Sequence, residues 1–360
     1  MPKRIVHMLN SMGMGGIENF IMNLYRSINR EEYQFDFILQ SKEEGYFEKE
    51  IKELGGNIYK IPRIEKQPLK HLTELRKILK SNEYIAFHRH TDNSVNFMDL
   101  AIAQSVNIKN VIVHSHTTSH SKEALNKICR PLLYSFADEH LACGQAAGEW
   151  LFGNKKFKII KNGMQLEKYE YSEEKRNLCR EKFGFSSTDI VIGHVGRFSD
   201  VKNQKFLIEV FEKISKLNEQ YKLIFCGDGE LRGELSLYCK ENGLDGKVIF
   251  LGVRRDINEI LQAMDLFAFP SKYEGLGIAL IEAQLTSLPC LISKNIPKEA
   301  LYNNNILQLG IEESDKEEWC KQIVAFPITT AYRSYKNEKL YNEYDVRNIA
   351  RELCEIYEGE

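Results

Sequence analysis

Two glutamates and two glycines within residues 269–290 have the types and spacing to bind a ligand that carries phosphate and hydroxyl groups. Gly275 and Gly277 precede a segment of helical apolar spacing, and glycine lets backbone N–H groups at a helix start approach an anion closely. Glu274 stands in the same loop, and Glu282 follows eight residues later, about two helical turns further on. This arrangement suits a nucleotide sugar, whereas the alternative is a βαβ unit with two solvated glutamates.

The elements that must position these residues are two buried strands and the helix between them. The apolar runs Leu266–Phe269 and Cys290–Ile292 predict the strands, and Ile278–Leu285 predicts the helix. Similar runs recur along the chain and alternate with helix-like segments, which predicts an α/β fold of parallel sheets with helices on both faces. The other predicted strands are Arg4–Leu9, Tyr33–Leu39, Asn57–Ile61, Tyr84–Phe87, Val111–Val113, Glu139–Ala142, Ile190–Val195, Lys222–Cys226 and Val248–Leu251.

Length and composition set the class of protein. A chain of 360 residues suggests two domains, and its composition is ordinary for a globular protein. The net charge of −2 argues against a nucleic-acid-binding protein defined by overall charge. The cysteines are scattered without a C-x-x-C pair, no apolar run approaches a membrane span, and residues 1–10 do not resemble a signal peptide. We therefore expect a cytoplasmic protein.

A domain boundary is predicted at the turn signal Asn162-Gly163, before the charged stretch 167–182. We expect a Rossmann-like N-terminal domain over residues 1–165 and a Rossmann-like C-terminal domain over residues 166–342. The last segment, Glu343–Tyr357, predicts a helix with one apolar face.

A cationic site is predicted where the first strand of the C-terminal half ends. Residues 193–203 run from this strand into a glycine, then Arg197, then Lys202 at the start of a helix. Both side chains donate hydrogen bonds and the helix dipole adds positive potential, so the pair suits a diphosphate. Two surface cations without a ligand are the alternative.

Together these segments resemble the motifs of retaining glycosyltransferases with the GT-B fold, most closely the family 4 enzymes of capsule and exopolysaccharide biosynthesis. The Glu274-to-Glu282 segment resembles the family's Glu-x7-Glu motif, and Arg197 to Lys202 resembles its Gly-Arg-x4-Lys-Asn motif. The resemblance covers nearly the whole chain. It implies two Rossmann-like domains that face each other across a cleft, with a final helix at about 343–360 that joins the N-terminal domain.

The resemblance also implies roles for individual residues. Glu274 would lie by the donor sugar, and Glu282 would bind the ribose hydroxyls. Arg197 and Lys202 would neutralise the departing nucleotide phosphate. Further donor-binding residues are expected in glycine loops and beside the base. They are Gly15, Gly16, Gly227, Val253, Arg254, Gly275, Leu276 and Gly277.

The first glycine loop, residues 11–18, invites comparison with a dinucleotide-binding loop. That interpretation fails because the third glycine should stand at position 18, which is Glu18. The loop resembles instead the Gly-Gly-x-Glu loop of family 4 enzymes, whose glycines face the donor diphosphate and the acceptor. A tight turn without a ligand remains the alternative. A departure occurs at residues 293–299, which lack the two glycines that the family carries after this strand.

Five of the nine histidines fall within residues 88–120. His88 with His90, and His114 with His116, have strand spacing, so each pair can share one face. A zinc site is one interpretation, but no H-E-x-x-H or Cys/His spacing supports it, and polar residues in loops are the simpler alternative. By the resemblance, His116 contacts the donor sugar, with His114 as its substitute. His90 and His114 are acceptor-side candidates.

We therefore predict a retaining glycosyltransferase that moves a hexosyl or N-acetylhexosaminyl group from a UDP-linked donor to a lipid-linked glycan. No Asp-x-Asp motif stands at a strand end, so we expect no catalytic metal and no cofactor, with cations and helix N–H groups stabilising the leaving diphosphate. A sugar-nucleotide epimerase of GT-B shape is one alternative, and it would need acid/base carboxylates at the sugar. A non-catalytic nucleotide-sugar-binding partner is the other.

Two basic segments, Pro68–Lys80 and Lys122–Arg130, predict peripheral attachment of the N-terminal domain to an anionic membrane. The first segment has an apolar stripe on one face. A helix packed on a sheet has the same stripe, so only the cations need contact lipid. The polar residues around the rest of this helix are Lys70, His71, Arg76, Lys77 and Lys80.

Overall fold

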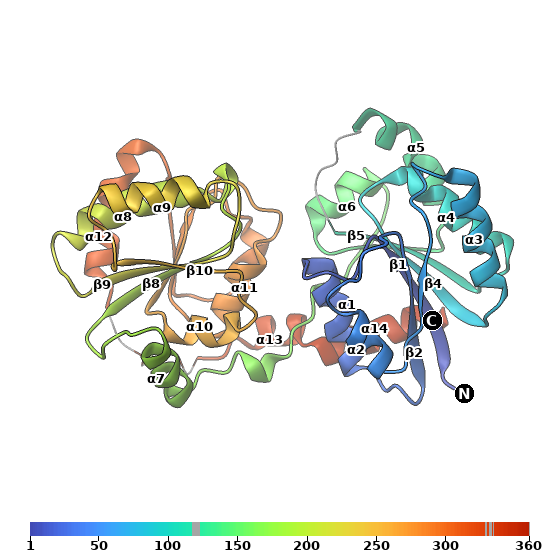
Figure 1. The fold of residues 1–360 in the computed structure, drawn as a ribbon, viewed down its shortest axis with the longest axis horizontal. Helices are drawn as coiled ribbons and strands as arrows, with labels where there is room; N and C mark the ends of the chain where they lie inside the picture. Colours follow the sequence, from blue (N-terminus) through green and yellow to red (C-terminus); the bar gives the residue numbers. More distant parts are fainter. Residues whose placement is uncertain (117–122, 328–329, 331–332, 334, 360) are drawn as a thin grey trace. The chain divides into compact units, whose positions relative to one another are not determined.

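The structure is a computed structural model that describes residues 1–116, 123–327, 330, 333 and 335–359. The chain divides into two compact units, one formed by Met1–Gln165 with Asn342–Glu360 and the other by Leu166–Tyr341. Each unit is a parallel sheet with helices on both faces (Figure 1). His120 and Lys122, which the sequence analysis included in its histidine group and its second basic segment, lie outside the described residues.

The first unit is built on a parallel sheet of seven strands. The strands are β1 (Lys3–Leu9), β2 (Tyr33–Leu39), β3 (Ile58–Lys60), β4 (Tyr84–His90), β5 (Asn110–Ser115), β6 (Glu139–Ala142) and β7 (Lys158–Ile159), in the order β3-β2-β1-β4-β5-β6-β7. The helices are α1 (Gly16–Ser27), α2 (Glu48–Glu53), α3 (Pro68–Lys80), α4 (Phe97–Ser105), α5 (Glu123–Ser135), α6 (Gln145–Phe152) and α14 (Val346–Glu358).

The second unit repeats this plan with a parallel sheet of six strands. The strands are β8 (Ile190–Val195), β9 (Tyr221–Cys226), β10 (Val248–Gly252), β11 (Leu266–Phe269), β12 (Cys290–Ser293) and β13 (Ile306–Leu309), in the order β10-β9-β8-β11-β12-β13. The helices are α7 (Glu173–Lys182), α8 (Gln204–Ser215), α9 (Arg232–Glu241), α10 (Ile257–Ala263), α11 (Ile278–Leu285) and α12 (Lys316–Ala325), and α13 (Glu338–Tyr344) leads back to the first unit.

Alternation along the strands divides each core between the two faces of the sheet. In β1, Ile5 and Leu9 pack in the core beneath α1 and α14, whereas Val6 and Met8 pack in the core beneath α3 to α6. Because both faces are covered, the strands are apolar along nearly their whole length, as parallel sheets require. This explains why runs of apolar residues located most of the strands in the sequence.

Both sheets have the doubly wound order, in which the chain reverses its direction of travel across the sheet. The reversals occur between β1 and β4 in the first unit and between β8 and β11 in the second. Loops diverge at the carboxyl ends of two such strands and leave a crevice where ligands bind. The fold therefore indicates one binding region in each unit.

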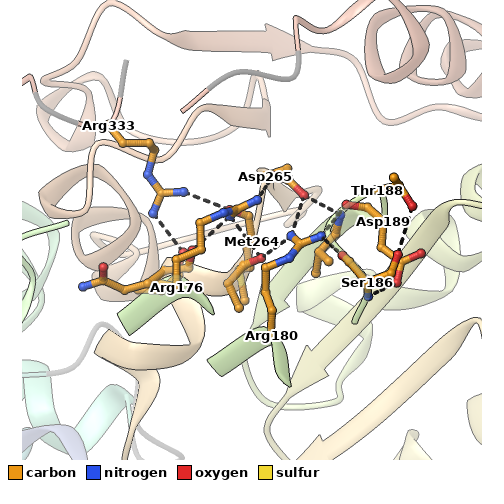
Figure 2. Close-up of polar contacts among 12 residues, drawn as sticks. Arg176, Arg180, Ser186, Thr188, Asp189, Met264, Asp265 and Arg333 are labelled. Atoms are coloured by element: carbon orange, nitrogen blue, oxygen red, sulfur yellow. Dashed lines mark hydrogen bonds and ion pairs between the residues drawn. The ribbon is translucent and has the colours of Figure 1, made fainter. Parts of the chain in front are cut away.

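A buried arginine cluster fixes the start of β11 in the second unit (Figure 2). Arg176 and Arg180 of α7 bind the Asp265 carboxylate at 2.5 and 3.2 Å. Arg176 and Arg333 also donate to carbonyl oxygens at the end of α10, where the helix dipole is negative. Burial lowers the pKa of Arg333 to about 10. The cluster thereby anchors the strand that leads to the loop of Glu274.

Three sequence predictions about the elements need correction. The predicted final helix, Glu343–Tyr357, is interrupted, because Asp345 has extended backbone and its side chain caps α14 by accepting from Arg347 N–H at 2.9 Å. The strands β7 and β13 were missed: β7 has only two residues, and β13 is an edge strand whose residues are half-buried or exposed. His71 is buried, where it bonds Asp99 at 2.7 Å, and does not lie on the polar face of α3.

Candidate functional site

Lys202 and Glu274 form an ion pair at the reversal point of the second sheet. They stand in the loops after β8 and β11, which are neighbouring strands. Lys202 Nζ lies 2.6 and 2.7 Å from the two Glu274 carboxylate oxygens. The Glu274 side chain is only 6% exposed and that of Lys202 is 24% exposed. A carboxylate so nearly buried needs a paired cation, and Lys202 supplies it.

Backbone geometry brings helix termini to this ion pair. Asn203 adopts a left-handed conformation, φ +56°, as the chain passes from Lys202 into α8. Gly277 precedes α11 with φ +75°, a conformation that costs little only for glycine. The loop of Glu274 and Gly275 therefore turns directly into α11, and Leu276 is buried beneath it. Leu280 N–H donates to the Gly277 carbonyl oxygen at 2.8 Å, whereas the N–H groups before it in a helix start generally have no partner within the helix and suit an anion.

Glu282 faces away from the apolar side of α11 and bonds to a residue far away in the sequence. Its carboxylate accepts from the Tyr169 hydroxyl at 2.7 Å. Burial raises the pKa of Glu282 to about 6, although the hydrogen bond from Tyr169 opposes the increase. The side chain nevertheless retains some accessible surface. A partly accessible carboxylate that accepts hydroxyl hydrogens can serve as a hydroxyl-binding group.

Arg197 lies on the surface near the ion pair, in the loop after β8. Its side chain is 74% exposed and reaches Glu230 at 3.1 Å. The loop after β9 contacts this loop closely, because a methyl group on Gly227 would stand 2.1 Å from the Gly196 carbonyl oxygen. Gly227 also has φ +135°, so glycine is required for both reasons. Glycine here holds two loops of the binding region together.

The two base-side candidates differ in their surroundings. Val253 is exposed, at 62% of its surface. Arg254 is half-buried, binds Asp256 at 2.5 Å and lies 5.7 Å over the Phe183 ring. Asp256, whose pKa is lowered to about 2 mainly by this hydrogen bond, holds Arg254 in place. Val253 is thus available to a ligand, whereas Arg254 is committed to protein contacts through its guanidinium.

The reversal point of the first sheet carries a cavity of about 440 Å³. It is lined by residues from the loops after β1, β2 and β4, together with Arg63 and Lys66. Glu18, at the start of α1, is one of the lining residues, and burial raises its pKa. Gly15 and Gly16 begin α1 and are exposed, with open space beside Gly16. The cavity wall includes His90.

Five histidines of the first unit form a buried network of hydrogen bonds. His90 contacts His7 at 3.0 Å and His116 at 2.9 Å, each through ring nitrogens. His88 contacts His114 at 3.2 Å and the Tyr357 hydroxyl of α14 at 2.9 Å. Burial lowers the pKa of all five, to about 3 for His7 and His116, so the rings are neutral at pH 7.

This network corrects the simpler interpretation that the histidines are polar residues in loops. His88, His90 and His114 belong to strands β4 and β5 and face the core that α1 and α14 cover. His114 has no accessible surface, so it cannot contact a donor or an acceptor directly. His116 follows β5 and is half-buried, which leaves it as the histidine of its pair that a ligand can reach.

Sequence reasoning did not find Tyr169 or His7. Tyr169 follows a short helical turn at the beginning of the second unit and has no motif of its own. His7 stands in the middle of an apolar run, where a lone histidine is normally a core residue. His7 pairs in register with His88 of the neighbouring strand, and this pairing was the available signal. It can be recognised only when the order of the strands in the sheet is known.

Known proteins resemble this chain over most of its length. Residues 175–325 match the profile of the family described as glycosyl transferases group 1. The putative glycosyltransferase EpsF of Bacillus subtilis is 34% identical over 310 residues, which is 82% of this chain and 80% of EpsF. The capsular polysaccharide biosynthesis glycosyltransferase CapH of Staphylococcus aureus is 28% identical over 98% of both chains. The UDP-Gal:α-D-GlcNAc-diphosphoundecaprenol α-1,3-galactosyltransferase of Escherichia coli is 27% identical over 89% of this chain and 87% of its own.

Solved structures resemble the chain in fold. Anabaena Alr3699/HepE, in complex with UDP and glucose, has a TM-score of 0.80 and 21% identity, and the match covers 99% of this chain and all of that one. The two doubly wound units and this likeness identify the GT-B fold. Since EpsF exceeds 30% identity over four-fifths of both chains, the chain belongs to the group 1 glycosyltransferases.

Proposed function

We propose that the protein is a retaining, metal-independent glycosyltransferase that moves a hexosyl or N-acetylhexosaminyl group from a UDP-linked donor to a lipid-linked glycan during surface polysaccharide synthesis. The names of the relatives support the donor, the acceptor and the pathway class, since one acts in capsule synthesis and another uses UDP-galactose and a diphosphoundecaprenol-linked acceptor. The HepE complex with UDP and glucose supports the choice of nucleotide.

The observation that carries the proposal is the constellation at the reversal point of the second sheet. In it, the Lys202–Glu274 pair stands beside the start of α11, and Glu282 stands on α11 itself. We assign the diphosphate to Lys202, Arg197 and the first N–H groups of α11, which stabilise negative charge as the sugar leaves. We assign the ribose hydroxyls to Glu282 and the sugar to Glu274 and His116.

Retention follows in this proposal from attack on the face that the nucleotide leaves, so no protein nucleophile is required. The leaving diphosphate oxygen takes the proton of the attacking hydroxyl, the new glycosidic bond forms, and the old bond to the diphosphate breaks. Lys202 neutralises the charge on the diphosphate when its ammonium moves from Glu274 toward the phosphate. Because cations do this, removal of divalent metal by EDTA should not abolish transfer. Loss of activity in EDTA that Mn²⁺ or Mg²⁺ restores would contradict metal independence.

The test of the function is a donor screen with purified protein and a lipid-linked glycan. We expect release of UDP that depends on the acceptor, and a product whose anomeric configuration, measured by NMR, matches that of the donor. An inverted product would refute retention. Free epimerised sugar without acceptor would favour the epimerase alternative, and nucleotide-sugar binding without turnover would favour a non-catalytic partner. GDP release in place of UDP release would correct the nucleotide.

We assign the acceptor to the cavity of the first unit. Arg63 and Lys66 are exposed cations on its lining and suit the phosphates of a lipid-linked acceptor, while His90 and Thr91 line its inner wall. Arg63→Ala should raise KM for a diphosphate-linked acceptor and leave KM for the donor unchanged, because only the acceptor's phosphates would contact this residue.

We also propose peripheral contact with the cytoplasmic face of the membrane. No helix among the described residues is long and apolar enough to cross a membrane. On α5, Leu125, Ile128 and Leu132 are 42%, 73% and 44% exposed and share one helix face. Lys77 and Lys80 are exposed on α3 in the same unit. The apolar residues on α5 thus add hydrophobic groups to the membrane contact that the sequence predicted from cations alone.

A further inference from the structure

The buried histidine network leaves ring nitrogens without partners. His7 Nε2 and His114 Nε2 are both buried, and neither atom takes part in a hydrogen bond. A neutral imidazole carries one N–H donor and one acceptor nitrogen, and an unpaired buried polar atom costs free energy. Both histidines are fully buried, so solvent does not satisfy them.

No choice of tautomers removes this deficit. His90 uses both nitrogens, so the row His7–His90–His116 can run in either direction, and in both cases His7 Nε2 stays unmatched. The row Tyr357–His88–His114 ends in the same way at His114 Nε2. The five neutral imidazoles therefore have more ring nitrogens that could act as ligands than their hydrogen bonds occupy.

Three of these rings are close enough to share one ion. His90, His114 and His116 can each offer a ring nitrogen within 4.8 Å of the others. His90 Nδ1 and His116 Nε2 are 2.9 Å apart. Two nitrogens on a tetrahedral zinc ion stand about 3.3 Å apart, given Zn–N bonds of about 2.0–2.1 Å. An ion would thus take the place of the hydrogen bond between these two nitrogens if they moved apart by a few tenths of an ångström.

The hydrogen-bond partners behind these rings allow the tautomers that metal binding requires. When His90 binds through Nδ1, its Nε2–H donates to His7 Nδ1. When His114 binds through its unpartnered Nε2, its Nδ1–H donates to His88, which in turn donates to Tyr357. Metal-bound histidines normally have such acceptors behind them. Each ring keeps one proton throughout, so binding releases none.

We infer that His90, His114 and His116 form a binding site for a divalent transition-metal ion of the zinc type. Neutral imidazole is the form that binds such ions, and the buried rings are held neutral. The half-buried His116 at the end of β5 gives the ion a route from solvent. The alternative group of His7, His88 and His90 is more deeply buried, and of these three residues His90 alone lies on the wall of the cavity.

The test uses the full chain, freed of metal, with Zn²⁺ and Co²⁺ as probes. Equilibrium dialysis should give one tightly bound Zn²⁺ per chain, and Co²⁺ should produce the visible absorption of a nitrogen-bound ion. X-ray absorption of the zinc form should show nitrogen neighbours at about 2.0 Å and no sulfur at about 2.3 Å. This last measurement separates the site from the half-buried cysteines Cys129, Cys143 and Cys354.

Variants identify the residues. His116→Gln and His114→Gln should each raise Kd for Zn²⁺ at least tenfold, whereas His140→Gln should not change it. His140 is a suitable control because it belongs to the same unit but stacks on Tyr134, outside the network. His114 is buried and its variant must first show a normal melting curve. The half-buried His116 provides a second variant if that one fails to fold.

Three outcomes would overturn the inference. They are no stoichiometric binding at micromolar Zn²⁺, sulfur in the X-ray absorption spectrum, or affinities unchanged by both His114→Gln and His116→Gln. None of these measurements uses activity, so they are independent of the proposed function. A consequence for inhibition does rest on that function: if His116 faces the donor sugar, Zn²⁺ should raise KM for the donor in the wild-type enzyme.

Discussion

At the scale of the residue, the two cations that we assign to the diphosphate are each paired with a carboxylate of the second unit. Lys202 holds the nearly buried Glu274, while Arg197 reaches the exposed Glu230. The two cations therefore differ in what they do for the fold, although we assign both to the diphosphate. Mutating them should separate a catalytic effect from a structural one.

Lys202→Ala and Arg197→Ala should each lower kcat by on the order of 10²–10³, because each removes a positive charge that we assign to the leaving diphosphate. Lys202→Ala should also lower Tm, since it strands the Glu274 carboxylate in a poorly solvated position. Arg197→Ala should leave Tm nearly unchanged, because exposed ion pairs contribute little. Kinetic assays and thermal melts measure both effects. Turnover within a few-fold of wild type for both variants would refute the diphosphate assignment.

Glu282 should make the stability of the protein depend on pH. Its folded-state pKa of about 6 lies above the ordinary value of 4.5, so the folded protein retains a proton that the unfolded chain loses. The free energy of unfolding should therefore fall as pH rises from 4.5 to about 6, and Glu282→Gln should abolish this fall. Its size should be on the order of 1–2 kcal/mol. Urea unfolding across this pH range measures it.

Tyr169→Phe is the matched variant for this prediction. The Tyr169 hydroxyl lowers the pKa of Glu282, so its removal should raise that pKa and extend the fall in stability to higher pH. A Glu282→Gln variant with the same pH profile as the wild type would show that Glu282 titrates normally.

At the scale of the element, the site depends on where helices begin. Gly277 gives α11 its starting direction through a left-handed conformation, and Asn203 does the same for α8. These positions decide where the N–H groups of each helix point. If the chain entered the same helix in a different direction, the apolar face would be unchanged, but the proposed anion site would be lost.

Gly277→Ala should lower the free energy of unfolding by about 1–2 kcal/mol, because an alanine at φ +75° is strained. It should also weaken UDP binding, since relief of the strain turns the first N–H groups of α11. Gly233→Ala is the control, because Gly233 lies in α9 with open space around it, and alanine there should be neutral or stabilising. Chemical unfolding and UDP titration measure the two effects. Equal UDP affinity in Gly277→Ala and the wild type would remove α11 from the donor site.

At the scale of the whole molecule, two units of the same doubly wound plan carry different chemistry at equivalent places. The reversal point of the second sheet presents paired charges, whereas that of the first presents a cavity and a row of neutral histidines. The first unit also carries the exposed apolar stripe on α5. These differences are the basis for the proposed assignment of the donor to the second unit and of the acceptor to the first.

Liposome co-sedimentation should show binding to anionic vesicles at low salt that weakens at high salt, because the cations of α3 and α5 contribute electrostatic attraction. Ile128→Ser should reduce this binding several-fold, since Ile128 is the most exposed residue of the α5 stripe. Leu217→Ser, which changes a leucine of similar exposure in the second unit, should have no effect. Equal pelleting with neutral vesicles, or none with either kind at low salt, would favour a soluble acceptor.

The sequence by itself determined the class of fold and the position of most strands. Buried strands of a doubly wound sheet are apolar on both faces, and so they stand out as short apolar runs, as Leu266–Phe269 does between Asp265 and Pro270. The motif residues Lys202 and Glu274 were found in the same way, because glycines and charges at a strand's end form a local pattern. Local patterns fail at edge strands that are not fully buried, such as β7 and β13, or where one residue interrupts a helix, as Asp345 does.

Only the tertiary structure decided which distant residues meet. The partnership of Tyr169 with Glu282 joins residues 113 positions apart, and no local spacing encodes it. The histidine network depends on β1 lying beside β4, an order that the chain reaches by crossing the sheet and that periodicity does not reveal. Burial then decides the state of these groups: it keeps five imidazoles neutral, and it raises the pKa of Glu282. The physical reason is that solvation depends on everything packed around a side chain, whereas sequence shows only its neighbours along the chain.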